Sequence, residues 1–223
     1  MSELPKQAKP RSDRAEWTYG KILRAAGLVF EKKGYEGATV NEICETADVT
    51  KGALYYHFKD GKVDMATAIL ESTLNVDGLV QQEITLQMVI DTGMILAYHI
   101  RREAQTRAAL RLSLTHDARE VYGTPWPDWI KINTAQLDEA RQKGEILPGV
   151  DTASQAHQIA GTWSGLVLTS HALYGNLEGI EARVATMYEN LLTAIAHPSY
   201  LRKLNFDTDR PERLVRAFLE KKG

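Results

Sequence analysis

The chain has 223 residues, of which 43% are hydrophobic and 25% charged, and 27 Lys and Arg against 29 Asp and Glu give a net charge of −2. This composition excludes a disordered chain, and the length suits one or two domains. Cys44 is the only cysteine, which excludes an intrachain disulfide scaffold and favours a reducing compartment. No apolar run reaches about 18 residues and no apolar signal segment is present at the N-terminus, so we expect a cytoplasmic protein without a membrane span.

Helical periodicity covers nearly the whole chain, and no segment alternates as a strand does. In the range 17–33, apolar residues recur at spacings of three and four, and Gly34 is a natural stop for that helix. A short helix is predicted at 39–47, because its start has the pattern of a capping box. In such a box the Thr39 hydroxyl accepts a hydrogen bond from the Glu42 N–H, and the Glu42 carboxylate can reach back.

A second short helix begins at Thr50 and ends near His57, and residues 59–61 break the pattern. The later helices are predicted at 62–79, 84–100, 106–115, 129–142, 151–174, 178–196 and 209–222. Two prolines close together predict a loop at 122–127. The pattern therefore predicts an all-α fold, with an N-terminal arm and three-helix unit in residues 1–62 and a larger helical domain in residues 63–223. It does not indicate what the tail 201–223 packs against.

The two short helices, which follow a longer helix and are joined by a tight turn, form a helix-turn-helix arrangement. Its second helix presents N-terminal residues to the major groove, and free N–H groups at helix starts suit phosphates. Gly52 allows close approach of the backbone, and lysines supply positive charge. Residues 1–62 also have a net charge of +2, against −4 for the remainder, although an ordinary solvated surface gives a similar contrast. The candidate DNA-binding residues are Thr39, Thr50, Lys51, Gly52, Tyr55, Tyr56, His57 and Lys62.

The segments GYEGATVNEI (34–43) and ADVTKGALYYHF (47–58) resemble the DNA-binding domain of the TetR family of transcriptional repressors. The resemblance implies an all-helical homodimer that binds a palindromic double-stranded operator and is released when a ligand binds in the larger domain. It places all of the candidates above except Lys62 at the DNA-facing positions of the family, and it assigns Phe58 to packing. The connection 58–65 is one residue longer than is usual in the family, which leaves the hinge geometry open.

Three further segments, 107–112, 125–129 and 140–147, resemble the γ-butyrolactone receptor branch of that family. These autoregulator receptors of filamentous soil bacteria repress secondary-metabolism genes until a small lactone binds. The resemblance implies that Trp129 lines the ligand pocket and that Thr162 offers a hydroxyl. The alternative is a relative that senses an antibiotic or a biosynthetic intermediate.

An alkyl lactone needs an apolar tunnel with one or two polar groups. The candidate ligand-binding residues are Trp129, Thr162, Trp163, Met94, Thr67, Gln87 and Leu110. Because apolar residues at helical spacing are usually core, ordinary packing stays open for the apolar members of this set.

The helices at 151–174 and 178–196 have broad apolar faces, and Gly161 and Gly165 permit close approach of another helix. In the TetR family the corresponding pair forms a four-helix dimer interface, so we expect a homodimer through these helices. A purely intramolecular core is the alternative.

The sequence offers no catalytic constellation. Its six histidines do not pair at i, i+3 or i, i+4, so no metal site is predicted. No phosphate-binding glycine loop or dinucleotide fingerprint is present, so no cofactor is expected. The stretch Gly161–Gly165 lacks the preceding strand of a nucleophile elbow. We therefore expect a regulator and not an enzyme.

Overall fold

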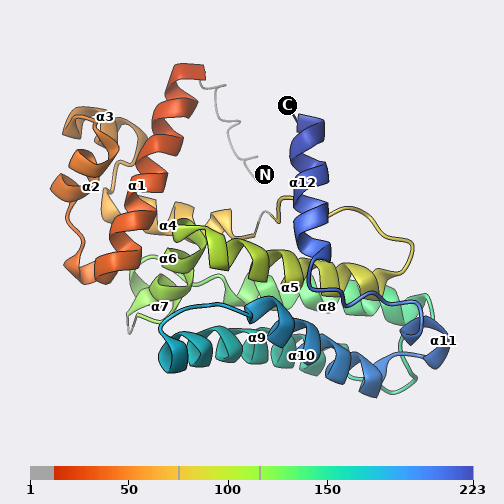
Figure 1. The fold of residues 1–223 in the computed structure, drawn as a ribbon. Coiled ribbons are helices and arrows are strands. Elements are labelled where there is room, and N and C mark those ends of the chain that lie inside the picture. The colour runs from red at the N-terminus through yellow and green to blue at the C-terminus, as the bar shows by residue number, and fades with distance from the viewer. Residues whose placement is uncertain (1–12, 75, 116, 223) are drawn as a thin grey trace, which may run out of the picture.

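The computed structural model describes residues 13–74, 76–115 and 117–222, and Figure 1 shows them as an assembly of helices. The predicted N-terminal arm, residues 1–12, lies outside these described residues. In chain order the helices are α1 (Asp13–Gly37), α2 (Val40–Ala47), α3 (Lys51–His57), α4 (Lys62–Ser72), α5 (Thr85–Arg102), α6 (Ala104–Ser113), α7 (Ala118–Val121), α8 (Trp126–Gln142), α9 (Thr152–Tyr174), α10 (Ile180–Ile195), α11 (Pro198–Leu201) and α12 (Arg210–Lys222). Within the described ranges the one β-type pairing is an isolated bridge between Ile146 and Ala196. The predicted all-α fold is confirmed.

Local side-chain chemistry sets the start of α2. The Thr39 hydroxyl accepts a hydrogen bond from the Glu42 N–H at 3.2 Å, as predicted. The reciprocal half of the expected capping box is not formed, because the Glu42 carboxylate binds the Lys33 ammonium at 2.8 Å. That ion pair joins the surfaces of α2 and α1, which pack together through the buried core.

Helix α4 ends at Ser72, earlier than the predicted end at residue 79. The hydroxyls of Ser72 and Thr73 donate to the carbonyls of Ile69 and Leu70, each at 2.7 Å. These local bonds offer the carbonyls an alternative to the helical pattern. Gly78 then adopts a φ of +100°, which no helix allows.

Other boundaries differ from the predictions for reasons that are equally local. Helix α8 begins at Trp126, inside the predicted loop 122–127, because Pro127 occupies the first turn, where a backbone N–H is not needed. Gly34 has a φ of +73° and interrupts α1 at the predicted stop, although helical turns continue to Gly37. The short helices α7 and α11 were not predicted.

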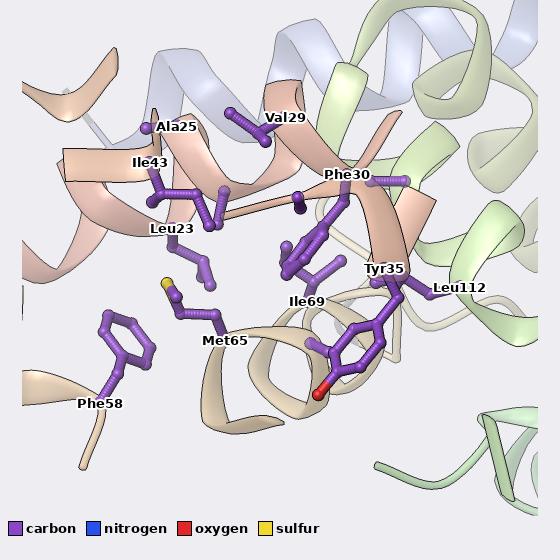
Figure 2. Packing of buried hydrophobic residues seen from close by; sticks show 14 of the residues in the cluster. Leu23, Ala25, Val29, Phe30, Tyr35, Ile43, Phe58, Met65, Ile69 and Leu112 are labelled. Atoms are coloured by element: carbon purple, nitrogen blue, oxygen red, sulfur yellow. The ribbon is translucent and has the colours of Figure 1, made fainter. Parts of the chain in front are cut away.

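Two hydrophobic cores organise the molecule. The first joins α1–α4 to α6 and α7, and Figure 2 shows Phe30, Ile43, Phe58, Met65 and Leu112 converging in it. The second joins α5 to α8, α9 and α10. Packing is therefore continuous across the predicted boundary at residue 62, and α6 belongs to the same core as the helix-turn-helix.

The tail ends in α12, which lies across α5 (Figure 1). The guanidinium of Arg210 donates to both carboxylate oxygens of Asp91, at 2.7 and 2.8 Å, and Asp91 is only 1% exposed. Gln87 accepts from the Asn205 N–H at 2.8 Å and donates to the Asn205 carbonyl at 3.1 Å. Buried polar pairing therefore fixes the tail on α5. No helix in the described residues is long and apolar enough to cross a membrane.

Candidate functional site: a DNA-facing helix and an apolar cavity

Helix α3 presents an exposed polar face on a buried apolar base. Leu54 is fully buried, and the Phe58 ring stacks on Tyr19 with 4.8 Å between ring centroids. The Thr50 hydroxyl accepts from the Ala53 N–H at 3.2 Å and so caps the helix. This packing holds α3 in a fixed orientation.

The predicted DNA-binding residues differ in their exposure. Tyr55 and Tyr56 are 45% and 76% exposed. His57 is half-buried and packs its ring against Tyr19 and Tyr56. Four other members of the set are exposed: Thr39, Thr50, Lys51 and Gly52.

Lys62 is placed differently from these residues. Its ammonium donates to the Tyr35 carbonyl at 2.8 Å and lies 4.5 Å from the centroid of the Tyr35 ring. Lys62 therefore ties the start of α4 to the end of α1. A phosphate contact would require the ammonium to share or leave that carbonyl.

An apolar cavity lies between α5, α6, α8 and α9. It has two lobes of about 30 Å³ each, which share Leu96, Trp126, Trp129 and Trp163 as walls. Leu110 of α6 lines one lobe. The structure thus brings together three of the predicted ligand-binding residues, namely Trp129, Trp163 and Leu110.

The other predicted ligand-binding residues lie elsewhere. Thr67 donates to the Tyr122 carbonyl at 3.3 Å, and Gln87 is bound to the tail. Met94 is buried in the second core. Thr162 is exposed in a groove between α9 and α10. Ile159 and Trp163, one helical turn apart, face the cavity, and Thr162 lies off that inward face. Helical periodicity identified inward faces but did not identify which inward residues meet at a void.

Polar groups on the cavity wall were missed at the sequence level. Asn133 and Thr92 line one lobe and are 4% and 2% exposed. The Trp163 indole N–H donates to the Gly93 carbonyl at 3.0 Å, which fixes that ring. The available signal was a polar residue on an otherwise apolar helical face, since buried polar groups need partners.

A larger polar cavity of about 560 Å³ adjoins one lobe and shares Thr73, Leu96 and Thr106 with it. Its wall includes His99 and Glu103, whose Nδ1 and Oε1 atoms are 2.7 Å apart. Burial lowers the pKa of His99, but the hydrogen bond and charge of Glu103 outweigh burial and raise it above the ordinary value. The hydrogen bond from His99 lowers the pKa of Glu103. Phe218 of α12 also lines this cavity.

Helix α6 connects the cavity to the helix-turn-helix. One face of α6 carries Leu110 on the cavity wall, and the other face packs on α1. Arg107 Nε lies 2.5 Å from Glu31 Oε1, and Arg111 donates to the Glu31 carbonyl at 2.5 Å. A displacement of α6 would therefore move α1 and the helices packed on it.

Among the described residues, no three His, Cys, Asp or Glu side chains cluster as metal ligands would.

Comparisons with known proteins agree with this architecture. The family "Bacterial regulatory proteins, tetR family" matches residues 22–69. The A-factor receptor protein of Streptomyces griseus is 35% identical over 189 residues, which cover 84% of this chain and 67% of the relative.

Two solved structures have the same fold. That of the full-length TetR regulator TylP of Streptomyces fradiae has a TM-score of 0.86 and 32% identity, and the match covers 92% of this chain and 99% of the other. That of a γ-butyrolactone receptor described as ArpA-like has a TM-score of 0.68 and 27% identity, over 91% and 99% of the two chains. With its capped helix-turn-helix coupled to an apolar cavity, the chain belongs to the TetR family and is a ligand-responsive transcriptional regulator, not an enzyme.

Proposed function

We propose that this regulator is a repressor that binds a palindromic operator as a homodimer and is released by a γ-butyrolactone-type signal, so that it controls secondary-metabolite genes. The observation that carries the proposal is the tryptophan-walled cavity on α6, the helix that packs against α1. The walls that its two lobes share are Leu96 and three tryptophans, which suit an alkyl chain. Relatives named as an A-factor receptor and a γ-butyrolactone receptor support the choice of ligand class.

The dimer is proposed to form through α9 and α10. These helices run side by side along one edge of the molecule (Figure 1). A groove of about 590 Å³ lies between them, and Leu166 and Leu191 line it together with the exposed Thr162. Gly161 and Gly165 have open space where a side chain would stand. A second copy would cover these apolar groups, and the two α3 helices would enter major grooves about 34–36 Å apart.

Release would follow from widening of the cavity. Lobes of about 30 Å³ are much smaller than the roughly 300 Å³ or more of an ordinary ligand site. A lactone must therefore displace wall residues such as Trp126 and Leu110, and with Leu110 the helix α6. Moving the protein from mostly operator-bound to mostly released requires about 5 kcal/mol of preference for the released conformation.

The experiment is fluorescence anisotropy of a labelled duplex from the gene's own upstream region, with and without a panel of γ-butyrolactones. The proposal expects salt-dependent binding that one lactone abolishes. If the protein binds the duplex but no lactone disturbs it, the ligand class is wrong and the alternative, an antibiotic or a biosynthetic intermediate, takes its place. If the protein binds no palindrome from that region, local repression is wrong.

A further inference from the structure

A buried oxygen without a partner lies on the wall of the tryptophan cavity. In the described residues three buried side-chain oxygens have no hydrogen-bond partner: Thr124 Oγ1, Asn133 Oδ1 and Gln136 Oε1. Two of these belong to α8, one helical turn apart. Asn133 is 4% exposed and lines the cavity. Because leaving a buried polar atom unpaired is costly, these acceptors call for an explanation.

The orientation of the Asn133 amide is determined by its neighbour. Asn133 Nδ2 donates to the Trp129 carbonyl oxygen at 2.8 Å. A carbonyl oxygen only accepts, so the amide nitrogen must face it and Oδ1 must point the other way. The free group of Asn133 is therefore an acceptor and not a donor.

The orientation of Gln136 follows from Thr92, which also lines the cavity. The Thr92 hydroxyl donates its proton to the Met88 carbonyl at 2.7 Å. Its oxygen can then only accept from Gln136, whose Nε2 lies 3.3 Å away. Gln136 Oε1 is thus left as a second free acceptor. Both amides are fixed by bonds that leave an oxygen, and not an N–H, without a partner.

We propose that Asn133 and Gln136 form the polar end of the effector site and recognise a hydrogen-bond donor, a hydroxyl group on an otherwise apolar ligand. The inference rests on the proposed function, because it assigns the effector to the same cavity. The alkyl part would lie against Trp129 and Trp163, and the hydroxyl proton would go to Asn133 Oδ1, with Gln136 Oε1 as the second acceptor when the cavity widens. A ligand with a ketone or ether at that position offers only lone pairs and leaves both acceptors unpaired.

The test compares ligands that carry a hydroxyl donor with close analogues that carry none. The first set is an alkyl-γ-butyrolactone with one free hydroxyl, its methyl ether, and the ketone made by oxidising that hydroxyl. The second pair is 1-octanol and methyl heptyl ether, which lack the lactone ring. Binding to the full-length protein is measured by tryptophan fluorescence and calorimetry. We expect the free hydroxyl to bind at least about tenfold more tightly than the ether or the ketone, because a site built for a donor rejects a ligand without one.

Variants assign this preference to the two side chains. Asn133→Leu keeps the approximate shape of the side chain, removes the acceptor, and should abolish the difference between hydroxyl and ether. Gln136→Met should reduce the same difference, and it supplies the test if Asn133→Leu does not fold. Gln142→Met, at the exposed end of α8, is the matched control and should keep it.

The outcomes separate this inference from the proposed function. If no lactone binds but octanol is preferred over its ether and Asn133→Leu removes the preference, donor recognition holds and the lactone signal is wrong. If hydroxyl and ether bind equally, or if no probe binds, donor recognition at Asn133 is overturned. A preference for the hydroxyl that survives both variants also overturns it.

Discussion

At the scale of single residues, exposure and packing separate the DNA face from the groups that support it. Lys51 is exposed at the start of α3, whereas the Lys62 ammonium is held by the Tyr35 carbonyl. Two lysines that look equivalent in the sequence therefore lie in different surroundings. A free ammonium at a helix start releases counterions when it meets a phosphate.

Replacing Lys51 with alanine should weaken binding to every duplex and reduce the slope of log affinity against log salt by about one. The reason is that a phosphate contact carries no base information. The measurement is anisotropy at several salt concentrations with operator and scrambled duplexes. Lys131→Ala, an exposed lysine of α8, is the control. A loss confined to the operator would show that Lys51 reads bases instead.

Gly93 and Tyr188 both line the apolar cavity and lie next to each other. A Cβ atom at Gly93 would lie 2.1 Å from the Tyr188 hydroxyl oxygen and 2.7 Å from its ring, and Tyr188 is buried. Gly93→Ala should therefore lower the free energy of unfolding by about 1–3 kcal/mol, as overpacking does.

Thermal and urea unfolding would measure this change. Gly20→Ala is the control, because its new Cβ would meet only the end of the Arg24 side chain at 3.4 Å. That substitution should be neutral or stabilise α1 by roughly 0.5–1 kcal/mol. An unchanged midpoint for Gly93→Ala would mean that Tyr188 moves aside freely.

At the scale of elements, α6 connects the two functional regions. It lies against α1 on one side and contributes a wall of the cavity on the other. Gly27 permits this approach, because a Cβ there would lie 3.0 Å from the Gln105 Cα. A helix that packs on both cores has the geometry of a coupling element, since under the proposed function a ligand in the cavity and DNA on α3 would each bias its position.

Arg107→Ala should weaken the coupling while both separate binding events persist. The substitution removes the contact of Arg107 with Glu31 and frees α1 from part of α6. We expect ligand-induced loss of operator affinity to shrink by roughly 0.5–2 kcal/mol. The measurement is operator affinity with and without ligand, with Arg141→Ala, whose Asp138 partner is on the same helix, as the control. Full release in Arg107→Ala would exclude this route.

The α5–α6 junction should make stability depend on pH. The pKa of His99 is raised, so its contribution is complete below about 6.5, the unfolded value, and is lost as pH rises through the folded value. The pKa of Glu103 is lowered, so its contribution is complete above about 4.3 and is lost as pH falls through the folded value. The difference in melting temperature between the wild type and His99→Gln should therefore be largest near pH 6 and shrink toward pH 9. A difference that stays constant over that range would contradict this assignment.

At the scale of the whole molecule, the proposed dimer determines how far apart two α3 helices stand. The proposed interface is the exposed face of α9 and α10, where Gly161 and Gly165 leave open space for a partner helix. A two-fold symmetric dimer presents its two α3 helices symmetrically, so the operator that it binds should be palindromic.

Gly161→Glu should convert the dimer to a monomer, because it places a charge in that contact. Light scattering coupled to size-exclusion chromatography would show a halved mass, and operator affinity should fall with it. Ala217→Glu, at an exposed position of α12, is the control and should remain dimeric. A dimeric Gly161→Glu would move the interface elsewhere.

The periodicity of the sequence was sufficient for the long helices and for the helix-turn-helix, because both depend on local chemistry, but it did not predict the short helices α7 and α11. Thr39 and Thr50 cap their helices through bonds to residues three positions ahead, and such spacings are visible in a linear chain. Two helix boundaries were predicted wrongly. The end of α4 at Ser72 depends on the rotamer of a hydroxyl group, and the start of α8 at Trp126 depends on a proline that the first turn of a helix accommodates.

The lining of the apolar cavity was only partly predictable, because helical spacing identifies an inward face but not the void that the face meets. The candidates Trp129, Trp163 and Leu110 line this cavity, whereas Thr162 points outward and Gln87 binds the tail. The sequence alone determined the all-α architecture and the family motif. Only the tertiary structure decided that α6 packs on both cores and that Asn133 keeps an acceptor without a partner, because both facts depend on how the helices pack together.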